Sequence, residues 1–217
     1  MRAVIFDMDG LMLDTEPLAA RAWAEAAQAM GIAFDPGVTA RLIGRNHADC
    51  RALLRAHHGE SYPVESLMDR WLVAYDAIVA CEGVAIKPGL IELLDWLETR
   101  DVAKAVATST RRSRALAKLE HTGLLPRFGA VVGGDEIARG KPAPDIFIAA
   151  AERLGAAPEQ CVVLEDSEPG VHAALAGGMT PIMVPDLHAP SPDVVRANVL
   201  VMSTLHDVQR HFAVRYA

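Results

Sequence analysis

Short apolar runs recur along the chain and constrain its fold more than any other feature. Apart from one lysine they carry no charge, and they do not alternate apolar with polar residues as half-buried strands do. Continuous apolar runs of this length are typical of parallel strands that are covered on both faces. The runs lie at residues 3–6, 103–107, 130–132, 161–164, 181–184 and 199–202. We therefore expect a buried, parallel sheet.

Helical patterns lie between these runs, at residues 89–100, 111–122 and 144–154. The first of them places four leucines on a single helix face. The last has a proline at its start and a glycine just after its end, which is a start-and-stop signal for a helix. Alternation of strands and helices predicts an α/β fold with a doubly wound, Rossmann-like parallel sheet.

One long interval, residues 15–84, contains no convincing strand. Its first part, Pro17–Met30, holds seven alanines in fourteen residues, and residues 38–58 and 63–81 also have helical patterns. Residues 82–89 read as a linker. We therefore predict two domains, an α/β core formed by residues 1–14 and 85–217 and an inserted all-α cap domain formed by residues 15–84.

Composition excludes several classes of protein. The chain of 217 residues is 51% hydrophobic, which excludes disorder, and its formal net charge of −7 argues against nucleic acid as a partner. No secretory signal and no apolar stretch long enough for a membrane span are present, and Cys50, Cys81 and Cys161 are scattered. We expect a cytoplasmic monomer with reduced thiols and no membrane partner.

Polar residues follow four of the predicted strands. Ligands of doubly wound sheets bind beyond the carboxyl ends of the strands, so these residues are candidates for a common site. They are Asp7, Asp9 and Gly10 after the first strand, Thr108 and Ser109 after the second, Lys141 in the loop after the third, and Glu165 and Asp166 after the fourth.

The residue types indicate the chemistry. Asp7 and Asp9 are two apart, so in extended chain they point to the same side, and their charges repel unless a cation lies between them. With Asp166 they would suit a hard cation, most simply Mg²⁺. Lys141 and the Thr108 hydroxyl add donors opposite the carboxylates, where a phosphate group would fit.

In this order the motifs resemble those of the haloacid dehalogenase superfamily, and more closely those of its β-phosphoglucomutase-like phosphatases. The resemblance covers nearly the whole chain, and the ordered set is far more specific than any one motif. The motifs are Asp7-x-Asp9-Gly10-x-x-x-Asp14-Thr15-Glu16, Thr108-Ser109, Gly140-Lys141-Pro142-x-Pro144-Asp145 and Glu165-Asp166-Ser167.

The resemblance implies a role for each catalytic residue. Asp7 would be the nucleophile that forms an aspartyl-phosphate, and Asp9 would be the general acid and then the general base. Thr108 and Lys141 would hold the transferring phosphoryl group.

The resemblance also implies a metal site and a mobile cap. Asp7, the backbone carbonyl of Asp9, and Asp166 would bind Mg²⁺, with Glu165 as a further or an indirect ligand. The inserted helices would close over the site, with hinges near Thr15 and Lys87.

Two departures from the mutase pattern concern the cap. Ala19 stands where the mutases have a histidine, and His47 stands where they have an arginine that holds a second phosphate. Both differences favour hydrolysis. The candidate substrate-binding residues are Gly10, Ser109, Glu16, Arg45, Asn46 and His47.

The sequence therefore predicts a Mg²⁺-dependent phosphatase that hydrolyses a small phosphorylated metabolite, such as a sugar phosphate. A mutase of the β-phosphoglucomutase type and a phospho-accepting module that does not hydrolyse its substrate stay open as alternatives. Dehalogenation is less favoured, because it requires neither a metal nor a second aspartate such as Asp9.

Overall fold

A computed structural model of the protein describes residues 1–33, 35–42, 47–187 and 189–216. The chain divides into two compact units. The first, here called the core unit, consists of Met1–Asp14 and Ala85–Ala217, and the second, here called the helical unit, is Thr15–Val84.

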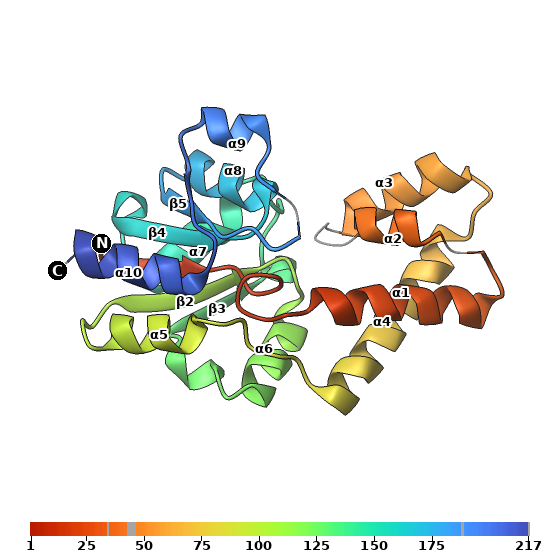
Figure 1. Ribbon diagram of the computed structural model, residues 1–217, viewed down its shortest axis with the longest axis horizontal. Coiled ribbons are helices and arrows are strands. Elements are labelled where there is room, and N and C mark those ends of the chain that lie inside the picture. The colour runs from red at the N-terminus through yellow and green to blue at the C-terminus, as the bar shows by residue number, and fades with distance from the viewer. Residues whose placement is uncertain (34, 43–46, 188, 217) are drawn as a thin grey trace. The chain divides into compact units, whose positions relative to one another are not determined.

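The described residues of the core unit form a six-stranded sheet in the order β3-β2-β1-β4-β5-β6, and every neighbouring pair is parallel (Figure 1). The strands are β1 (Ala3–Phe6), β2 (Ala103–Thr108), β3 (Ala130–Gly133), β4 (Cys161–Glu165), β5 (Thr180–Met183) and β6 (Leu200–Val201). The expected doubly wound parallel sheet is confirmed. Its strand order reverses between β1 and β4, and ligands of such folds bind at this reversal.

The central strands are buried on both faces, as their continuous apolar character predicts. All residues of β1 are fully buried. Ala3 and Ile5 belong to a core cluster with Phe147 from α7 and Ala173 from α8. Successive side chains of a strand point to opposite faces, so Val4 and Phe6 project to the other side, where Phe6 meets the edge of Phe128 with ring centroids 5.6 Å apart.

Helices connect the strands. Those of the core unit are α5 (Leu90–Glu98), α6 (Arg112–His121), α7 (Asp145–Arg153), α8 (Glu168–Ala176), α9 (Pro192–Arg196) and α10 (Leu205–Arg215), with short 3-10 turns at Leu125–Arg127, Gly134–Glu136 and Pro158–Gln160. The first three fall where the helical patterns predict them. The last three were not anticipated, although Ser167, Ser191 and Thr204 cap their first turns with side-chain oxygens.

The helical unit contains α1 (Glu16–Met30), α2 (Pro36–Leu42), α3 (His47–His58) and α4 (Val64–Glu82) in its described part. Trp23 of α1 stacks on Trp71 of α4 with ring centroids 5.0 Å apart, and the Trp71 indole N–H donates to the Ala19 carbonyl at 3.2 Å. These aromatic contacts hold the two longest helices of the unit together. Across the described parts of both units, no helix is long and apolar enough to cross a membrane.

The segments that connect the units are tied to the core. Leu13 forms an antiparallel bridge with Ile86, and the backbone N–H of Lys87 donates to the Met12 carbonyl at 2.9 Å. The Lys87 ammonium lies 2.6 Å from a carboxylate oxygen of Asp186. Lys87 is therefore held by both its backbone and its side chain within the core unit.

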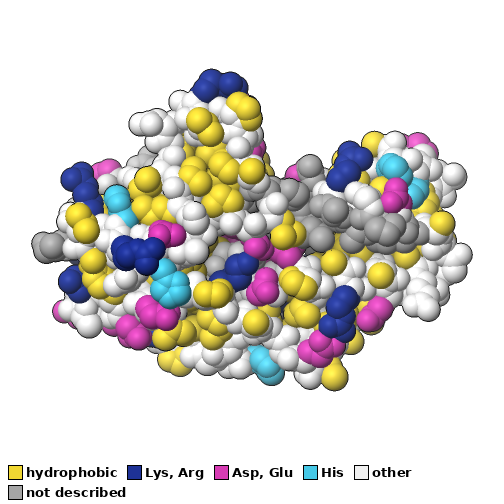
Figure 2. Space-filling model, viewed as in Figure 1, with side chains coloured by type: hydrophobic (Ala, Val, Ile, Leu, Met, Phe, Trp, Pro, Cys, Tyr) yellow, Lys and Arg dark blue, Asp and Glu magenta, His cyan; other side chains and the backbone are white. Residues whose placement is uncertain are grey.

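On the face of the molecule shown in Figure 2, the charged side chains of the described residues form small groups of mixed sign. Nucleic-acid interfaces need a continuous basic patch. No such patch is visible among the described residues on this face.

Candidate active site

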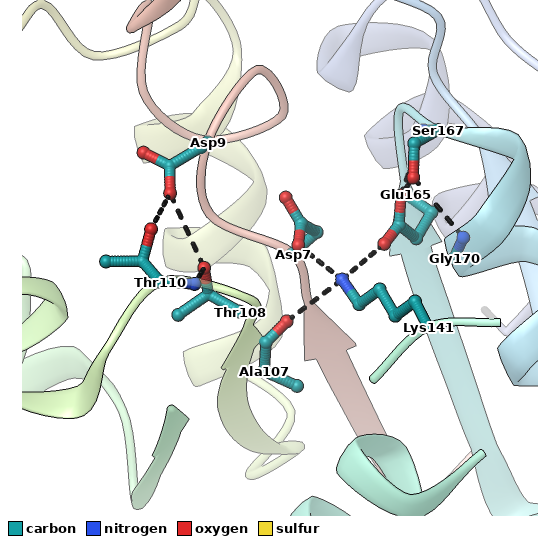
Figure 3. Close-up of polar contacts among 9 residues, drawn as sticks. All are labelled: Asp7, Asp9, Ala107, Thr108, Thr110, Lys141, Glu165, Ser167 and Gly170. Carbon is teal, nitrogen blue, oxygen red and sulfur yellow. Dashed lines mark hydrogen bonds and ion pairs between the residues drawn. The ribbon is translucent and has the colours of Figure 1, made fainter. Parts of the chain in front are cut away.

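Five of the residues predicted from the strand ends come together at the carboxyl edge of the sheet (Figure 3): Asp7, Asp9, Thr108, Lys141 and Glu165. Asp7 directly follows β1, which lies between β2 and β4 where the strand order reverses. Glu165 is the last residue of β4, and Lys141 comes from the loop before α7. Each side chain is thus positioned by a buried strand or by a loop fixed beside one.

Lys141 lies between two carboxylates. Its ammonium nitrogen is 2.5 Å from Asp7 Oδ1 and 2.5 Å from Glu165 Oε1, and it also donates to the Ala107 carbonyl at 3.3 Å. The side chain of Lys141 is only 7% exposed and that of Glu165 is 0% exposed. The ring of Phe147 lies below the ammonium, 4.9 Å from it. This is a desolvated ion cluster, not a surface salt bridge.

Burial and charge act in opposite directions on these groups. Burial raises the pKa of the Asp7 carboxyl to about 7, although Lys141 opposes the shift and Glu165 adds to it. Burial would lower the pKa of Lys141, but Asp7 and Glu165 outweigh that effect and raise it. Lys141 therefore stays charged and can offset negative charge that gathers next to Asp7.

Glu165 is held at both oxygens. Oε1 accepts from Lys141, and Oε2 accepts from the Ser167 backbone N–H at 2.9 Å and from the Ser167 hydroxyl at 2.8 Å. A Cβ at Gly170 would lie 1.8 Å from Glu165 Oε1, so only glycine fits beside this carboxylate. Glu165 thereby ties Lys141 to the start of α8.

Asp7, Glu165 and Asp166 could hold a metal ion. Each offers a carboxylate oxygen, and these oxygens all lie within 4.8 Å of one another. The three carboxylates carry more negative charge than the single ammonium of Lys141 neutralises, and their oxygens suit a hard divalent cation. Gly10, with φ +87°, lies against them: a Cβ there would be 2.4 Å from Asp166 Oδ2. The residues present therefore fit the metal that the family motifs imply.

Asp9 has different partners from Asp7. Its Oδ1 lies 2.5 Å from the ammonium of Lys118, and its Oδ2 accepts from the Thr110 hydroxyl at 2.7 Å and, more weakly, from Thr108 at 3.4 Å. Burial disfavours the charged form of Asp9, but Lys118 and the hydroxyl of Thr110 outweigh burial and place its pKa below the usual value.

The expectation that Asp7 and Asp9 point to the same side assumed extended chain through both residues. The strand ends at Phe6, and the chain turns at Gly10. The side chains consequently separate in Figure 3, Asp7 toward Lys141 and Asp9 toward the loop after β2. The candidate metal cluster of the described residues includes the carboxylate of Asp7 and not that of Asp9.

The remaining candidates fall into three groups. Thr108 is buried at the end of β2, its hydroxyl accepting from the Thr110 N–H at 3.1 Å, whereas Ser109 is exposed. Glu16 is buried in α1 of the helical unit, and Ala19 lies in the same helix. Arg45 and Asn46 lie outside the described residues, and of His47 only the backbone, at the start of α3, is described.

Sequence reasoning missed Lys118 and Thr110. Lys118 lies on α6, three residues after the buried Ala115 and directly before the buried Leu119. Lys118 itself is only 5% exposed. A lysine on the apolar face of an amphipathic helix is a signal that could have singled it out. Thr110 offered no such signal, because hydroxyl residues are common in loops.

A family model described as haloacid dehalogenase-like hydrolase matches residues 1–178. A phosphorylated carbohydrates phosphatase from Thermotoga maritima is 34% identical over 179 residues, covering 82% of each chain. A beta-phosphoglucomutase from Bacillus subtilis is 30% identical over 226 residues, covering 99% of this chain and 98% of the relative.

Among solved structures, CbbY from Rhodobacter sphaeroides in complex with phosphate has a TM-score of 0.81 at 26% identity, covering 96% of both chains. The sequence matches and the fold therefore agree over nearly the whole chain. This chain belongs to the haloacid dehalogenase-like hydrolases.

Proposed function

We propose that this protein is a Mg²⁺-dependent phosphatase that hydrolyses a small phosphomonoester, such as a sugar phosphate, through an aspartyl-phosphate on Asp7. The observation that carries the proposal is the cluster of Asp7, Lys141 and Glu165, with both ion-pair distances at 2.5 Å. A carboxylate held beside a buried ammonium, next to two further acidic residues, suits attack on a phosphoryl group.

In the first half-reaction, a carboxylate oxygen of Asp7 attacks phosphorus while the bond from phosphorus to the ester oxygen breaks. The proton that the leaving alkoxide needs comes from Asp9, which must carry it when the substrate is bound. Lys141 and the hydroxyl of Thr108 would offset the negative charge of the transferring group.

In the second half-reaction, water attacks the aspartyl-phosphate. Asp9, now a carboxylate, accepts a proton from that water, the phosphorus–oxygen bond to Asp7 breaks, and inorganic phosphate leaves. Asp9 is thereby protonated for the next cycle. One residue serves as acid and then as base, so no further titrating group is needed.

Asp7 and Asp166, with the Asp9 carbonyl, would hold Mg²⁺, and Glu165 would act mainly through Lys141 and Ser167, to which its oxygens are already bonded. Bound Mg²⁺ supplies charge neutralisation for the phosphoryl oxygens. Lys141 supplies the same from the protein side.

The helical unit is, in this proposal, the cap that recognises the leaving group. Arg45, Asn46, His47 and Glu16 are its candidate contacts, while Gly10 and Ser109 are those of the core. The sequence predicts one hinge near Lys87, but both the backbone and the side chain of Lys87 are held within the core unit. We therefore place this hinge before Lys87, near Gly83, whose φ of +76° is a backbone conformation that favours glycine.

Hydrolysis is favoured over the mutase alternative because Ala19 lacks a side chain that could transfer a proton. The relatives include both a phosphatase and a mutase, so product analysis separates the two activities.

A panel of phosphorylated metabolites, assayed for phosphate release with Mg²⁺ and with EDTA, tests the proposal. We expect Mg²⁺-dependent release from at least one sugar phosphate and no net formation of an isomeric sugar phosphate. Isomer formation would favour the mutase, and a stable phosphoprotein without phosphate release would favour a phospho-accepting module. Activity that survives EDTA would contradict the metal requirement.

A further inference from the structure

Lys118 is a buried cation that the proposed chemistry does not yet use. It lies on α6 (Arg112–His121), and its side chain is 6% exposed. Lysines are almost never buried this far unless they are paired, because removing an ammonium from water costs several kcal/mol. Its partner is Asp9, at 2.5 Å.

The two oxygens of Asp9 have separate donors. Lys118 occupies Oδ1, and the hydroxyl of Thr110 occupies Oδ2 at 2.7 Å. An aspartate side chain has only two rotatable bonds, so donors at both oxygens fix the direction of its carboxyl group. Thr110 and Lys118 belong to one continuous segment, the loop after β2 and the helix that follows it.

We propose that Lys118, together with Thr110, is the positioning residue that sets the direction of the Asp9 carboxyl group in the reaction. This inference rests on the proposed function, because it requires Asp9 to be the acid and base of phosphoryl transfer. Lys118 acts through Asp9 and needs no contact with the substrate.

A second buried lysine shows what a purely structural role would look like. Lys104, at the start of β2, is 7% exposed and pairs with Glu98 at 2.9 Å, at the opposite end of the sheet from Asp7. Lys104→Met and Lys118→Met therefore remove the same group from similarly buried places, and only the second should affect the chemistry.

The experiment compares the first turnover of phenyl phosphate and of p-nitrophenyl phosphate, two esters of similar size. Phenol has a pKa of about 10, like the tyrosine side chain, and its departure needs a proton, whereas p-nitrophenolate leaves without one. The ratio of the rates at which phenol and nitrophenolate are released in the first turnover therefore reports on proton transfer by Asp9.

Loss of the Lys118 ammonium also lets the pKa of Asp9 rise, but a carboxyl group that is no longer correctly directed cannot deliver its proton. For Lys118→Met we therefore expect the first turnover of phenyl phosphate to slow at least about tenfold and that of p-nitrophenyl phosphate to change less than about twofold. Asp9→Asn should show the same selectivity with a larger effect, and adding Lys118→Met to it should slow phenyl phosphate no further. Lys104→Met should leave the ratio of the two rates unchanged.

Thr110→Val provides a second variant that keeps the buried charge pair, in case Lys118→Met does not fold. We expect the same selective loss, at a smaller size. Equal slowing of both esters by the folded variants, or no slowing, would overturn the positioning role while Asp9→Asn kept its selectivity. If the wild-type protein released phosphate from neither these esters nor any compound of the metabolite panel, the proposed function would fail, and this inference with it.

Discussion

Buried lysines at the two ends of the sheet have carboxylate partners that differ in solvent exposure. At the amino end, Lys104 pairs with Glu98, whose side chain is 43% exposed and also accepts from Arg127. At the carboxyl end, Lys141 lies between Asp7 and Glu165, and neither carboxylate is more than 10% exposed. An ammonium group is paired with a carboxylate at each end, but only at the carboxyl end are the partner carboxylates buried.

We propose that this difference separates a structural ion pair from a functional one. At the amino end, the buried ammonium of Lys104 is paired with a carboxylate that stays in contact with water. Burying two carboxylates around one ammonium carries a desolvation penalty that can exceed the electrostatic gain from the ion pairs. Groups with perturbed pKa values in such a cluster are candidates for catalysis, and a cost to stability is expected there.

The largest effect should follow from changing the nucleophile. Asp7→Asn replaces the attacking carboxylate with an amide of the same size, and we expect turnover to fall by at least about 10⁴-fold, as for nucleophile knockouts in other enzymes. Phosphate release measures it, and the melting temperature checks that the fold survives. A variant that kept more than a small fraction of the activity would show that Asp7 is not the nucleophile.

Removing each lysine tests the comparison directly. Lys141→Met leaves Asp7 and Glu165 facing each other without a cation, and we expect the free energy of unfolding to fall by about 3–5 kcal/mol, together with loss of activity. Lys104→Met leaves Glu98 exposed and still paired with Arg127, so we expect a loss of about 1 kcal/mol or less and normal activity.

Chemical denaturation of both variants without divalent cations measures these losses. Equal losses of stability at the two positions would show that burial of the carboxylates does not distinguish the two ends of the sheet.

Asp7, Asp9 and Lys141 were predictable because they follow continuous apolar runs, and parallel strands bring their carboxyl ends to one edge. The different directions of Asp7 and Asp9 were not, since they depend on the turn at Gly10 (φ +87°) and on a partner, Lys118, far along the chain. Hydrophobic periodicity locates strands and helices, but which donor meets which carboxylate is decided by packing between elements distant in sequence.

A smaller effect should follow at Gly10. Gly10→Ala forces a side chain into a positive-φ position and places its Cβ 2.4 Å from Asp166 Oδ2, so this carboxylate must shift. We expect the Mg²⁺ concentration for half-maximal activity to rise at least about tenfold. Gly155→Ala is the matched control, because it has a φ of +62° but nothing within 4 Å. A similar change in both variants would attribute the effect to backbone strain alone.

The smallest effect belongs to the amino end and depends on pH. Hydrogen bonds from Arg127, then from Lys104, lower the pKa of Glu98 from 4.5 to about 2. A lowered pKa means that the unfolded chain binds the proton more readily, so the stabilisation is complete above about pH 5 and disappears as the pH falls toward 2. Because Glu98 is 43% exposed, solvent screening limits this stabilisation to about 1 kcal/mol.

The difference in melting temperature between the wild type and Glu98→Gln should therefore shrink between about pH 5 and pH 2, and added salt should reduce the difference at neutral pH. A difference that stayed constant over this range would mean that Glu98 contributes through packing and not through charge, and the contrast between the two ends of the sheet would then rest on the carboxyl end alone.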